Sequence, residues 1–410
     1  MGPMAEVDSS GDHAFVDLVT DEPAPTPHSL AGAPLRVRVA LVSVLSTITA
    51  LLFGVGALSL FPAGAAWPTA VSVIGRAALA LAAVSLVYLT IRANGSRADD
   101  AAARVAHVLL GIGWLLFSWG LITGVGRLVL AIAGMPNPLR ARLVALTLAA
   151  LVVGLAIWGF WAARRVPPIR RTTVAIEGLV QPLTVAVLTD THFDAWTTPA
   201  WAQAIVARVN SENPDLVVHA GDLADGSVRA RRPQVEALAQ ISTPQRYYIA
   251  GNHEYYSDAP AWMGFMSEIG WEVLVNRHLV HRGLVVAGLD DPTGTSMAQR
   301  GPDLDAALLG APDLPVLLLA HQPHQVAEAL DRVDLQISGH THGGQIWPFH
   351  YMVRLREPVV AGLARASRRT QLYVSRGAGF WGPPFRIFAP SEISLLSLVP
   401  AEAVSSAKTR

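Results

Sequence analysis

The sequence predicts an N-terminal four-helix transmembrane region followed by an α/β domain, a two-sheet β sandwich flanked by helices. Three observations predict this organisation. Hydrophobic residues make up 51% of the 410 residues and charged residues only 15%, against roughly 25% charged residues in an average soluble protein. The long apolar runs all lie before residue 165. After Pro167 and Pro168, short segments rich in β-branched residues alternate with helical patterns.

The two ends of the chain carry no pattern of a packed structure. Segment 1–34 is rich in Pro, Asp, Glu and Ser and has few large apolar residues. Such a segment cannot bury enough apolar surface to offset the entropy lost on ordering. We therefore expect 1–34 to be a disordered tail and 401–410 to be a flexible tail.

Four apolar runs predict four transmembrane helices within 35–165. Each run is close to or above the ~20 residues that span a bilayer. The runs are 39–61, 70–91, 105–133 and 143–161. The first run is too long for a signal peptide and follows a long acidic leader, so we expect an anchor; cleavage within 61–65 is the alternative.

Arginine positions predict the orientation of these helices. Arginines lie before the first run, between the second and third, and after the fourth: Arg36, Arg38, Arg92, Arg97, Arg104, Arg164, Arg165, Arg170 and Arg171. The positive-inside rule then puts both ends of the region, and the C-terminal domain, in the cytoplasm. Arg140 and Arg142, between the last two runs, oppose this orientation. Arg76 and Arg127 lie within apolar runs, where an arginine is either functional or snorkels or pairs within the bundle.

Segment 172–400 is predicted to be the α/β domain. Strands are expected at 172–178, 183–188, 215–219, 246–250, 284–289, 315–320, 335–338, 371–375 and 393–399, and helices at 200–210 and 231–241. Strands alternate with helices early and cluster later. This order indicates two sheets with helices on their outer faces.

Five polar motifs each follow a predicted strand. They are Asp190-Thr191-His192, Gly221-Asp222-Leu223-Ala224-Asp225, Gly251-Asn252-His253-Glu254, the single His321, and Gly339-His340-Thr341-His342-Gly343-Gly344. Ligands collect at strand ends in α/β folds because the loops there converge. Imidazole, carboxylate and amide groups without sulfur are typical ligands of hard or borderline divalent metals, and the chain has no cysteine. A lone histidine is more often structural, so the prediction depends on all five motifs occurring together.

The order of these motifs resembles that of the calcineurin-like metallophosphoesterases. The resemblance covers about 172–400 and does not extend to the helical region. The string 339–346, with Tyr373-Val374-Ser375-Arg376-Gly377 downstream, resembles their membrane-attached bacterial branch. That branch is similar to the phosphodiesterases related to UDP-diacylglucosamine pyrophosphatases.

The resemblance implies a binuclear metal centre with seven ligands. One ion would be held by Asp190, His192 and His342. The other would be held by Asn252, His321 and His340, and Asp222 would bridge both. The resemblance also implies that His253 is catalytic rather than a ligand, facing the scissile phosphate as leaving-group acid or charge stabiliser. Asp225 would orient a ligand or its loop.

These residues predict a membrane-anchored, metal-dependent phosphoesterase. Two divalent ions, Mn, Fe or Zn, can lower the pKa of a bridging water toward ~7, and His253 has an ordinary pKa near ~6.5. We expect hydrolysis of a phosphodiester or pyrophosphate, with a lipid or cell-envelope precursor as candidate substrate, by attack of a metal-bridging hydroxide. Alternatives are a phosphomonoesterase on a soluble substrate, or a membrane transporter or sensor with a regulatory metal-binding domain. The expected partners are the lipid bilayer and a phosphoester, and not nucleic acid, because the formal net charge is zero.

Several other residues allow more than one interpretation. His219 is expected to be a buried structural residue. His324 either supports a metal ligand or begins a helix. The aromatic segments 347–351, which contains His350, and 380–385 either face lipid or form a small hydrophobic core. Arg376 either contacts substrate phosphate or forms a surface salt bridge.

Overall fold

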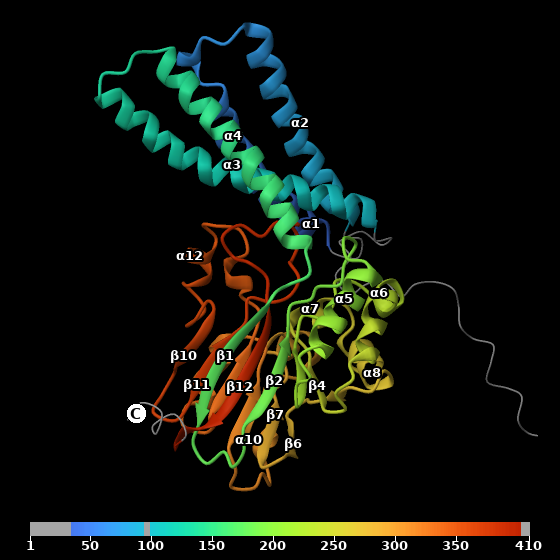
Figure 1. The fold of residues 1–410 in the computed structure, drawn as a ribbon. Helices are drawn as coiled ribbons and strands as arrows, with labels where there is room; N and C mark the ends of the chain where they lie inside the picture. The colour runs from blue at the N-terminus through green and yellow to red at the C-terminus, as the bar shows by residue number, and fades with distance from the viewer. Residues whose placement is uncertain (1–33, 94–98, 403–410) are drawn as a thin grey trace, which may run out of the picture.

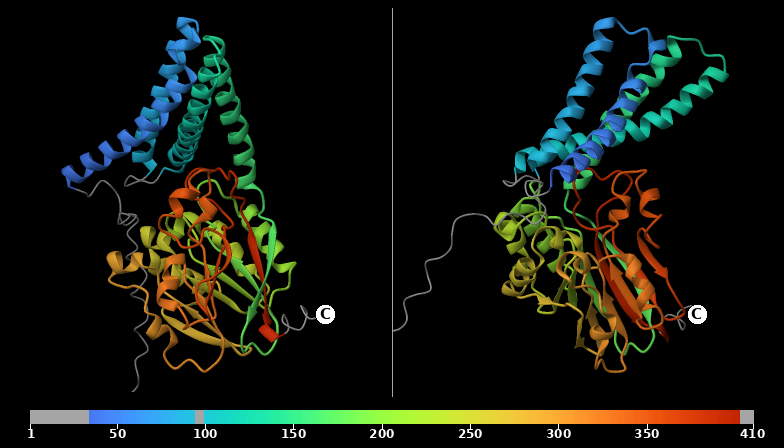
Figure 2. Two further views of the ribbon diagram at one scale, coloured as in Figure 1. Left: turned by 90° about the vertical axis from the view of Figure 1, so that its left-hand side faces the viewer. Right: turned by 180° about the vertical axis from the view of Figure 1, so that it is seen from behind.

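The computed structural model describes residues 34–93 and 99–402. The tails predicted at 1–34 and 401–410 lie almost entirely outside the described residues, and Arg97 lies outside them too. Four long helices rise from one end of an α/β domain (Figure 1). They are α1 (Leu35–Leu60), α2 (Thr69–Ala93), α3 (Asp100–Ile132) and α4 (Leu139–Arg164). The two rotated views in Figure 2 show all four on the same end of the domain.

Each of these helices is long and apolar enough to cross a bilayer, as the apolar runs predict. Their large apolar side chains point outward: Ile74, Leu81 and Val84 of α2 are each about two thirds exposed. Such surface is unfavourable in water and favourable against lipid tails. Arg76 donates from its guanidinium to the carbonyl of Phe61 at the end of α1, so it pairs within the helical region.

Within the described residues, the domain contains two six-stranded sheets. The first has the order β1-β12-β2-β3-β4-β5 and the second the order β10-β11-β9-β8-β7-β6. The first is built from β1 (Ile169–Ile176), β2 (Leu183–Leu188), β3 (Leu216–Ala220), β4 (Arg246–Ile249), β5 (Glu272–Val273) and β12 (Ile393–Pro400). The second is built from β6 (Arg277–His281), β7 (Leu284–Gly288), β8 (Val316–Leu319), β9 (Leu335–Ser338), β10 (Gly362–Arg365) and β11 (Gln371–Val374).

The two sheets pack face to face over a continuous apolar core. Val185 and Val218 of the first sheet belong to the same buried cluster as Val286 and Ile337 of the second. Helices cover the outer faces, which confirms the predicted sandwich flanked by helices. The first sheet carries α5 (Pro199–Asn210), α6 (Val228–Val235) and α8 (Ala259–Glu268), and the second carries α10 (Leu304–Leu308) and α11 (Val326–Ala329). The remaining short helices are α7 (Asn252–Ser257), α9 (Thr293–Ala298) and α12 (His350–Val353).

The helix predicted at 231–241 is shorter and begins earlier. Its first residue is Val228, because the Ser227 hydroxyl accepts the backbone N–H of Ala230 and caps the helix. After Val235 the chain tightens into a 3₁₀ segment, Glu236–Gln240. The change shortens the α-helix but leaves it on the same face of the sheet.

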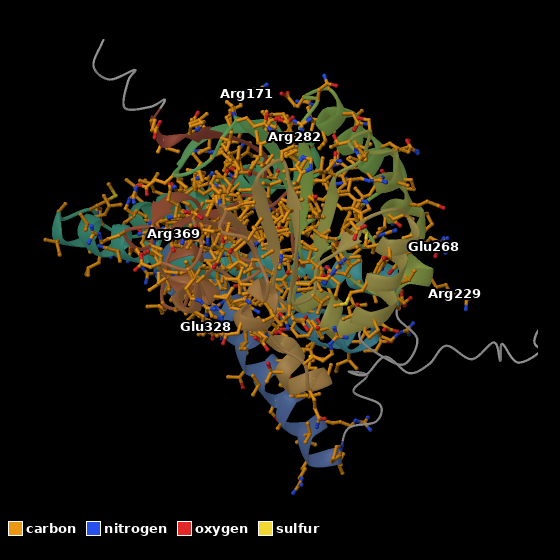
Figure 3. All side chains as sticks on the ribbon, turned by 90° about the horizontal axis from the view of Figure 1, so that it is seen from below. Arg171, Arg229, Glu268, Arg282, Glu328 and Arg369 are labelled. Carbon is orange, nitrogen blue, oxygen red and sulfur yellow. The ribbon has the colours of Figure 1, made fainter. Side chains whose placement is uncertain are left out.

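The helical region is packed directly against the domain. A Cβ atom on Gly111 of α3 would lie 2.4 Å from the Phe385 ring, so only glycine permits this contact. At the start of α3, Asp100 accepts two hydrogen bonds from Arg231 of α6, at 2.6 and 2.8 Å. The opposite end of the domain carries charged residues such as Arg171, Arg282 and Arg369, each in an ion pair (Figure 3). The end beside α1–α4 is therefore the membrane-facing end.

Candidate metal centre

Sharp turns at the strand ends aim the motif side chains at one another. Five motif residues have positive φ values between 39° and 70°, a region that non-glycine residues rarely adopt: Asp190, His192, Asp222, His340 and His342. Two glycines allow the turns to approach closely. A Cβ atom on Gly251 would lie 2.3 Å from Oδ1 of Asp222, and one on Gly221 would lie 2.6 Å from the His321 ring. The strained backbone conformations therefore occur where the loops that follow separate strands come together.

The first cluster consists of Asp190, His192 and His342, whose ligand atoms all lie within 4.8 Å of one another. The Nε2 atoms of His192 and His342 are 3.1 Å apart. Oδ1 of Asp190 lies 3.5 Å from Nε2 of His342. All three residues are buried.

The second cluster consists of Asp222, His321 and His340, joined by Asn252. Oδ2 of Asp222 lies 3.1 Å from Nε2 of His321, and Oδ1 of Asn252 lies 2.9 Å from Nδ1 of His340. The same Asp222 oxygen is 3.5 Å from Nε2 of His192 in the first cluster. One carboxylate oxygen therefore lies between the two clusters.

The donor set fits divalent cations. His321 is fully buried, and its Nδ1 lies 2.8 Å from the carbonyl of Ala220, which fixes the proton on that nitrogen. In the neutral ring, Nε2 then carries the lone pair that a metal ion would bind, and this atom lies 3.1 Å from Oδ2 of Asp222. Burial lowers the pKa of His321, but the carboxylates of Asp222 and Asp190 outweigh burial and raise it well above its usual value. The site thus attracts positive charge, which a metal ion would supply.

His253 stands beside both clusters without joining either three-ligand group above. Its Nδ1 lies 2.6 Å from Oδ1 of Asp225, and that same oxygen is 3.1 Å from Nδ1 of His192. Burial opposes protonation of His253, but Asp222 and Asp225 raise its pKa to about 9. The predicted catalytic residue is thus held as a cation at the rim of the site.

Two buried charged residues support the site, and the sequence pattern predicts a role for neither. Glu254 accepts the backbone N–H groups of Gly251, Asp222 and Leu223 at 2.7–3.1 Å, which ties the second motif to the third. Burial raises the pKa of Glu254 to about 7. Arg386 donates to the carbonyl of His342 at 2.7 Å, and its Nη2 lies 3.2 Å from Nδ1 of the same ring. For Arg386, the signal in the sequence is that a charged residue stands inside an aromatic, proline-rich segment.

Three other residues considered in the sequence, His219, His324 and Arg376, contact protein groups away from the two clusters. His219 lies in β3, 3.0 Å from the Thr191 hydroxyl, and burial lowers its pKa to about 3. His324 donates its backbone N–H to Glu357 at 3.0 Å, and its Nδ1 is 3.1 Å from the same carboxylate. Arg376 forms an ion pair with Glu392 at 2.8 Å. These three residues contact protein groups rather than the two clusters.

An apolar cavity of about 490 Å³ opens from the clusters toward the helical region. Its polar end includes Asp222, Asn252, His253, His340 and His342. Its far end includes Leu110 and Trp114 of α3, and its walls include Ile346, Phe349, Met352, Val353, Trp381 and Pro383. The aromatic segments at 347–351 and 380–385 therefore form part of a wall shared by the domain and α3. The Trp114 ring packs edge-on against Phe349 with ring centroids 5.7 Å apart.

Comparison with known proteins gives consistent results. The family model described as calcineurin-like phosphoesterase matches residues 183–344. An uncharacterized metallophosphoesterase of Helicobacter pylori is 36% identical over 246 residues, covering 59% of this chain and 66% of that protein, just under two thirds. An uncharacterized metallophosphoesterase of Campylobacter jejuni is 33% identical over 293 residues, 70% of this chain and 78% of that protein.

A vertebrate protein is similar over a comparable length. The transmembrane protein with metallophosphoesterase domain from Danio rerio is 32% identical over 305 residues, 70% of each chain. Seventy per cent of 410 residues is about 287, whereas 172–410 contains 239. This similarity therefore continues into the helical region, which corrects the expectation that it would stop at the α/β domain.

Proposed function

The chain belongs to the calcineurin-like metallophosphoesterase family, and on that premise we propose that it is a membrane-anchored enzyme hydrolysing a phosphodiester or pyrophosphate at a binuclear metal centre. The observation that carries the proposal is the position of Oδ2 of Asp222, within 3.5 Å of a histidine from each cluster. An oxygen shared in this way is what a bridging ligand requires.

The proposed ligands follow the two clusters. Asp190, His192 and His342 hold one ion; Asn252, His321 and His340 hold the other; and Asp222 contacts both. Mn²⁺, Fe and Zn²⁺ all accept imidazole and oxygen donors. When bound, the two ions supply a low-pKa water and neutralise charge on the phosphate oxygens.

The protein's own groups supply positioning and proton transfer. His253, held as a cation by Asp225, is placed to protonate the departing oxygen or to stabilise its charge. Asp225 also contacts Nδ1 of His192, so one carboxylate orients a proposed ligand and the proposed acid. The apolar walls beside His253 keep bulk water away from the phosphate.

The cavity supports a substrate with a hydrocarbon portion. Its walls are mostly apolar, and it runs from the proposed ligands to Leu110 and Trp114 of α3. A buried methylene group contributes roughly 0.8 kcal/mol, so a lipid chain would gain substantially there and an ion would not. A lipid or a lipid-linked cell-envelope precursor is therefore the proposed substrate class.

We further propose that the domain lies on the cytoplasmic side. The halves of the helices beside the domain carry Arg36, Arg38, Arg92, Arg104, Arg164 and Arg165, and the far halves carry Arg76, Arg127, Arg140 and Arg142. The difference follows the positive-inside rule.

The test of catalysis uses the full chain in detergent, stripped of metal and reloaded with Mn²⁺. We expect hydrolysis of bis(p-nitrophenyl) phosphate, and Asp222→Asn should reduce both kcat/KM and bound metal by at least about 100-fold. Asp313→Asn, a change of an exposed acid, is the matched control. Full activity in Asp222→Asn would contradict the shared-ligand role.

The test of substrate class compares lipid and aryl phosphodiesters. Phe349→Ala and Met352→Ala should raise KM for a lipid substrate several-fold and leave the aryl ester little changed. Leu355→Ala is the control, because Leu355 is 80% exposed near the same helix and does not line the cavity. An equal rise in KM for both substrates would show that these side chains support the fold and do not contact a lipid chain.

A further inference from the structure

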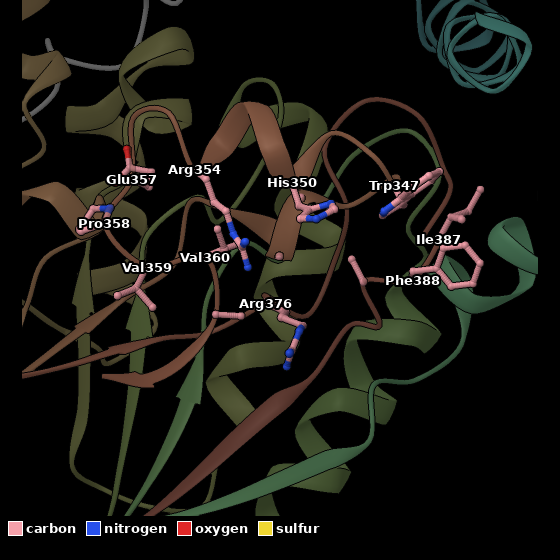
Figure 4. Close-up of a pocket in the computed structure, with 14 residues that line it drawn as sticks. Trp347, His350, Arg354, Glu357, Pro358, Val359, Val360, Arg376, Ile387 and Phe388 are labelled. Atoms are coloured by element: carbon pink, nitrogen blue, oxygen red, sulfur yellow. The ribbon is translucent and has the colours of Figure 1, made fainter. Parts of the chain in front are cut away.

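A second cavity, of about 690 Å³, lies behind the turn that carries His342. It is lined by none of the proposed metal ligands. Figure 4 shows His350 and Arg354 on one side, Trp347, Ile387 and Phe388 on the other, and Arg376 below them. Cationic and hydrogen-bonding groups thus share one cavity with an aromatic rim.

The charge of Arg354 is available to a ligand. Among the residues that the structure describes, no acid or carbonyl pairs with the exposed Arg354 side chain. The carboxylate in the wall, Glu357, is already bonded twice by His324. Burial, with the charge of Arg354 adding to it, lowers the pKa of His350, so His350 is a neutral imidazole able to donate a hydrogen bond.

The rim of the cavity packs against aromatic residues of two long apolar helices, α3 and α4. Phe388 packs against Trp158 of α4 with ring centroids 5.4 Å apart, and Trp347 packs against Trp119 of α3 at 5.2 Å. Trp158 follows the first residue of α4 by 19 positions. At ~1.5 Å per residue this is close to the ~30 Å thickness of a hydrocarbon layer.

The residues after Trp158 agree with this level. Trp161 is 59% exposed, and Arg164 and Arg165 follow at the end of α4. Aromatic rings followed by arginines are typical of the interface between hydrocarbon and headgroups. Phe388, itself 59% exposed, therefore borders the headgroup layer.

We propose that this cavity binds the phosphate headgroup of an anionic phospholipid from the surrounding bilayer. Arg354 and His350 contact the phosphate, and the acyl chains leave past Trp347 and Phe388. Guanidinium and imidazole donors bind phosphate oxygens through charge-assisted hydrogen bonds. The aromatic rim favours a lipid over free phosphate, which has no apolar part to bury.

Such a lipid would contact the scaffold of the metal centre. A Cβ atom on Gly344 would lie 2.4 Å from Cβ of His350, and one on Gly343 would lie 3.0 Å from Arg376. Both side chains are thus packed against the turn that follows His342. A bound headgroup would restrain that turn, so binding is expected to raise thermal stability as well.

The experiment titrates the full chain in detergent with dioctanoyl phosphatidylglycerol, with dioctanoyl phosphatidylcholine as the uncharged comparison. Binding is followed by native mass spectrometry and by the shift in Tm. We expect wild type to bind the anionic lipid about tenfold more tightly, and Arg354→Gln to lose most of that preference. Arg368→Gln, in the exposed turn between β10 and β11 at the other end of the domain, makes the same charge change and should bind as wild type.

Three results would overturn the proposal. They are equal affinity for the two lipids, unchanged affinity in Arg354→Gln, and displacement of the anionic lipid by inorganic phosphate at a similar concentration. The last result would mark a free-phosphate site. Because binding is measured directly, the outcome does not depend on whether the enzyme hydrolyses any given ester. The Tm of each variant without lipid reports that it has folded.

Discussion

Oδ1 of Asp225 lies 2.6 Å from Nδ1 of His253. The same oxygen is 3.1 Å from Nδ1 of His192, so a single carboxylate links a proposed ligand to the proposed acid. Movement of Asp225 would therefore disturb both metal affinity and proton transfer.

Asp225→Asn should shift the pH dependence of catalysis. Burial lowers the pKa of His253, but the carboxylates of Asp222 and Asp225 outweigh burial and raise it to about 9 in the protein without metal ions. Without the Asp225 charge that pKa falls, and the alkaline limb of kcat/KM should move to lower pH by roughly 1 unit. The profile is measured at saturating Mn²⁺, because metal affinity should also fall by roughly 10–100-fold. An unmoved limb would show that His253 does not act as the acid.

His253→Gln should separate proton transfer from metal binding. Bound metal, measured by elemental analysis, should stay near the wild-type value because His253 is not a proposed ligand. Loss of a general acid typically reduces rate by 10²–10⁴-fold. The reduction should be large for an alkyl leaving group and small for p-nitrophenolate, which departs without a proton. A similar loss for both leaving groups, or loss of metal, would contradict the assignment.

Gly159→Ala should weaken the contact between α4 and the domain. The new Cβ atom would lie 2.7 Å from Ile387, and the resulting strain should lower stability by roughly 1–3 kcal/mol. Gly154→Ala, on the same helix, is the control, because nothing lies within 4 Å of its Cβ position. There the helix should be unchanged or stabilised by up to about 1 kcal/mol. Thermal unfolding in detergent checks both, and equal Tm values would show that this contact is not tight.

Asp215→Asn should destabilise the domain in a pH-dependent way. Burial raises the pKa of Asp215, but Thr184 and Arg282 outweigh burial and lower it. A lowered carboxyl pKa stabilises the fold above the unfolded value of ~3.9, and this contribution is lost as the pH falls through the folded value. At pH 7 the free energy of unfolding of the variant should be roughly 1 kcal/mol lower than that of wild type. At a pH below the folded pKa of Asp215 the two proteins should be equally stable. Asp305→Asn, whose side chain is 88% exposed, should be neutral throughout.

The parts of the fold that follow from local pattern were predictable. The apolar segment of β2 was predicted at its observed bounds, Leu183–Leu188, because it is a short run rich in β-branched residues between two breaks. β5 was missed because it has two residues, Glu272 and Val273, and exists through pairing with β4. β10 was missed for a similar reason. Its four residues show only weak alternation of apolar and polar side chains, and the strand forms through pairing with β11.

The candidate site divides in the same manner. The motif residues were predicted because their types and their positions after strands are visible in the chain. Glu254 was predicted only as the end of a motif, since its hydrogen bonds join it to Asp222 and Leu223, which lie 32 and 31 positions earlier in the chain. Arg386 was not selected, because its contact with His342 exists only after the last loops fold over the site.

The position of β12 in the first sheet has a consequence for biosynthesis. This strand is the last along the chain, yet it lies between β1 and β2 and pairs with both. A ribosome releases α1–α4 toward the membrane long before Ile393–Pro400 is translated. The first sheet stays incomplete throughout that interval, with β2 and β1 lacking their shared neighbour. Maturation of the soluble half should accordingly follow membrane insertion, and nascent chains arrested before residue 393 should remain sensitive to protease.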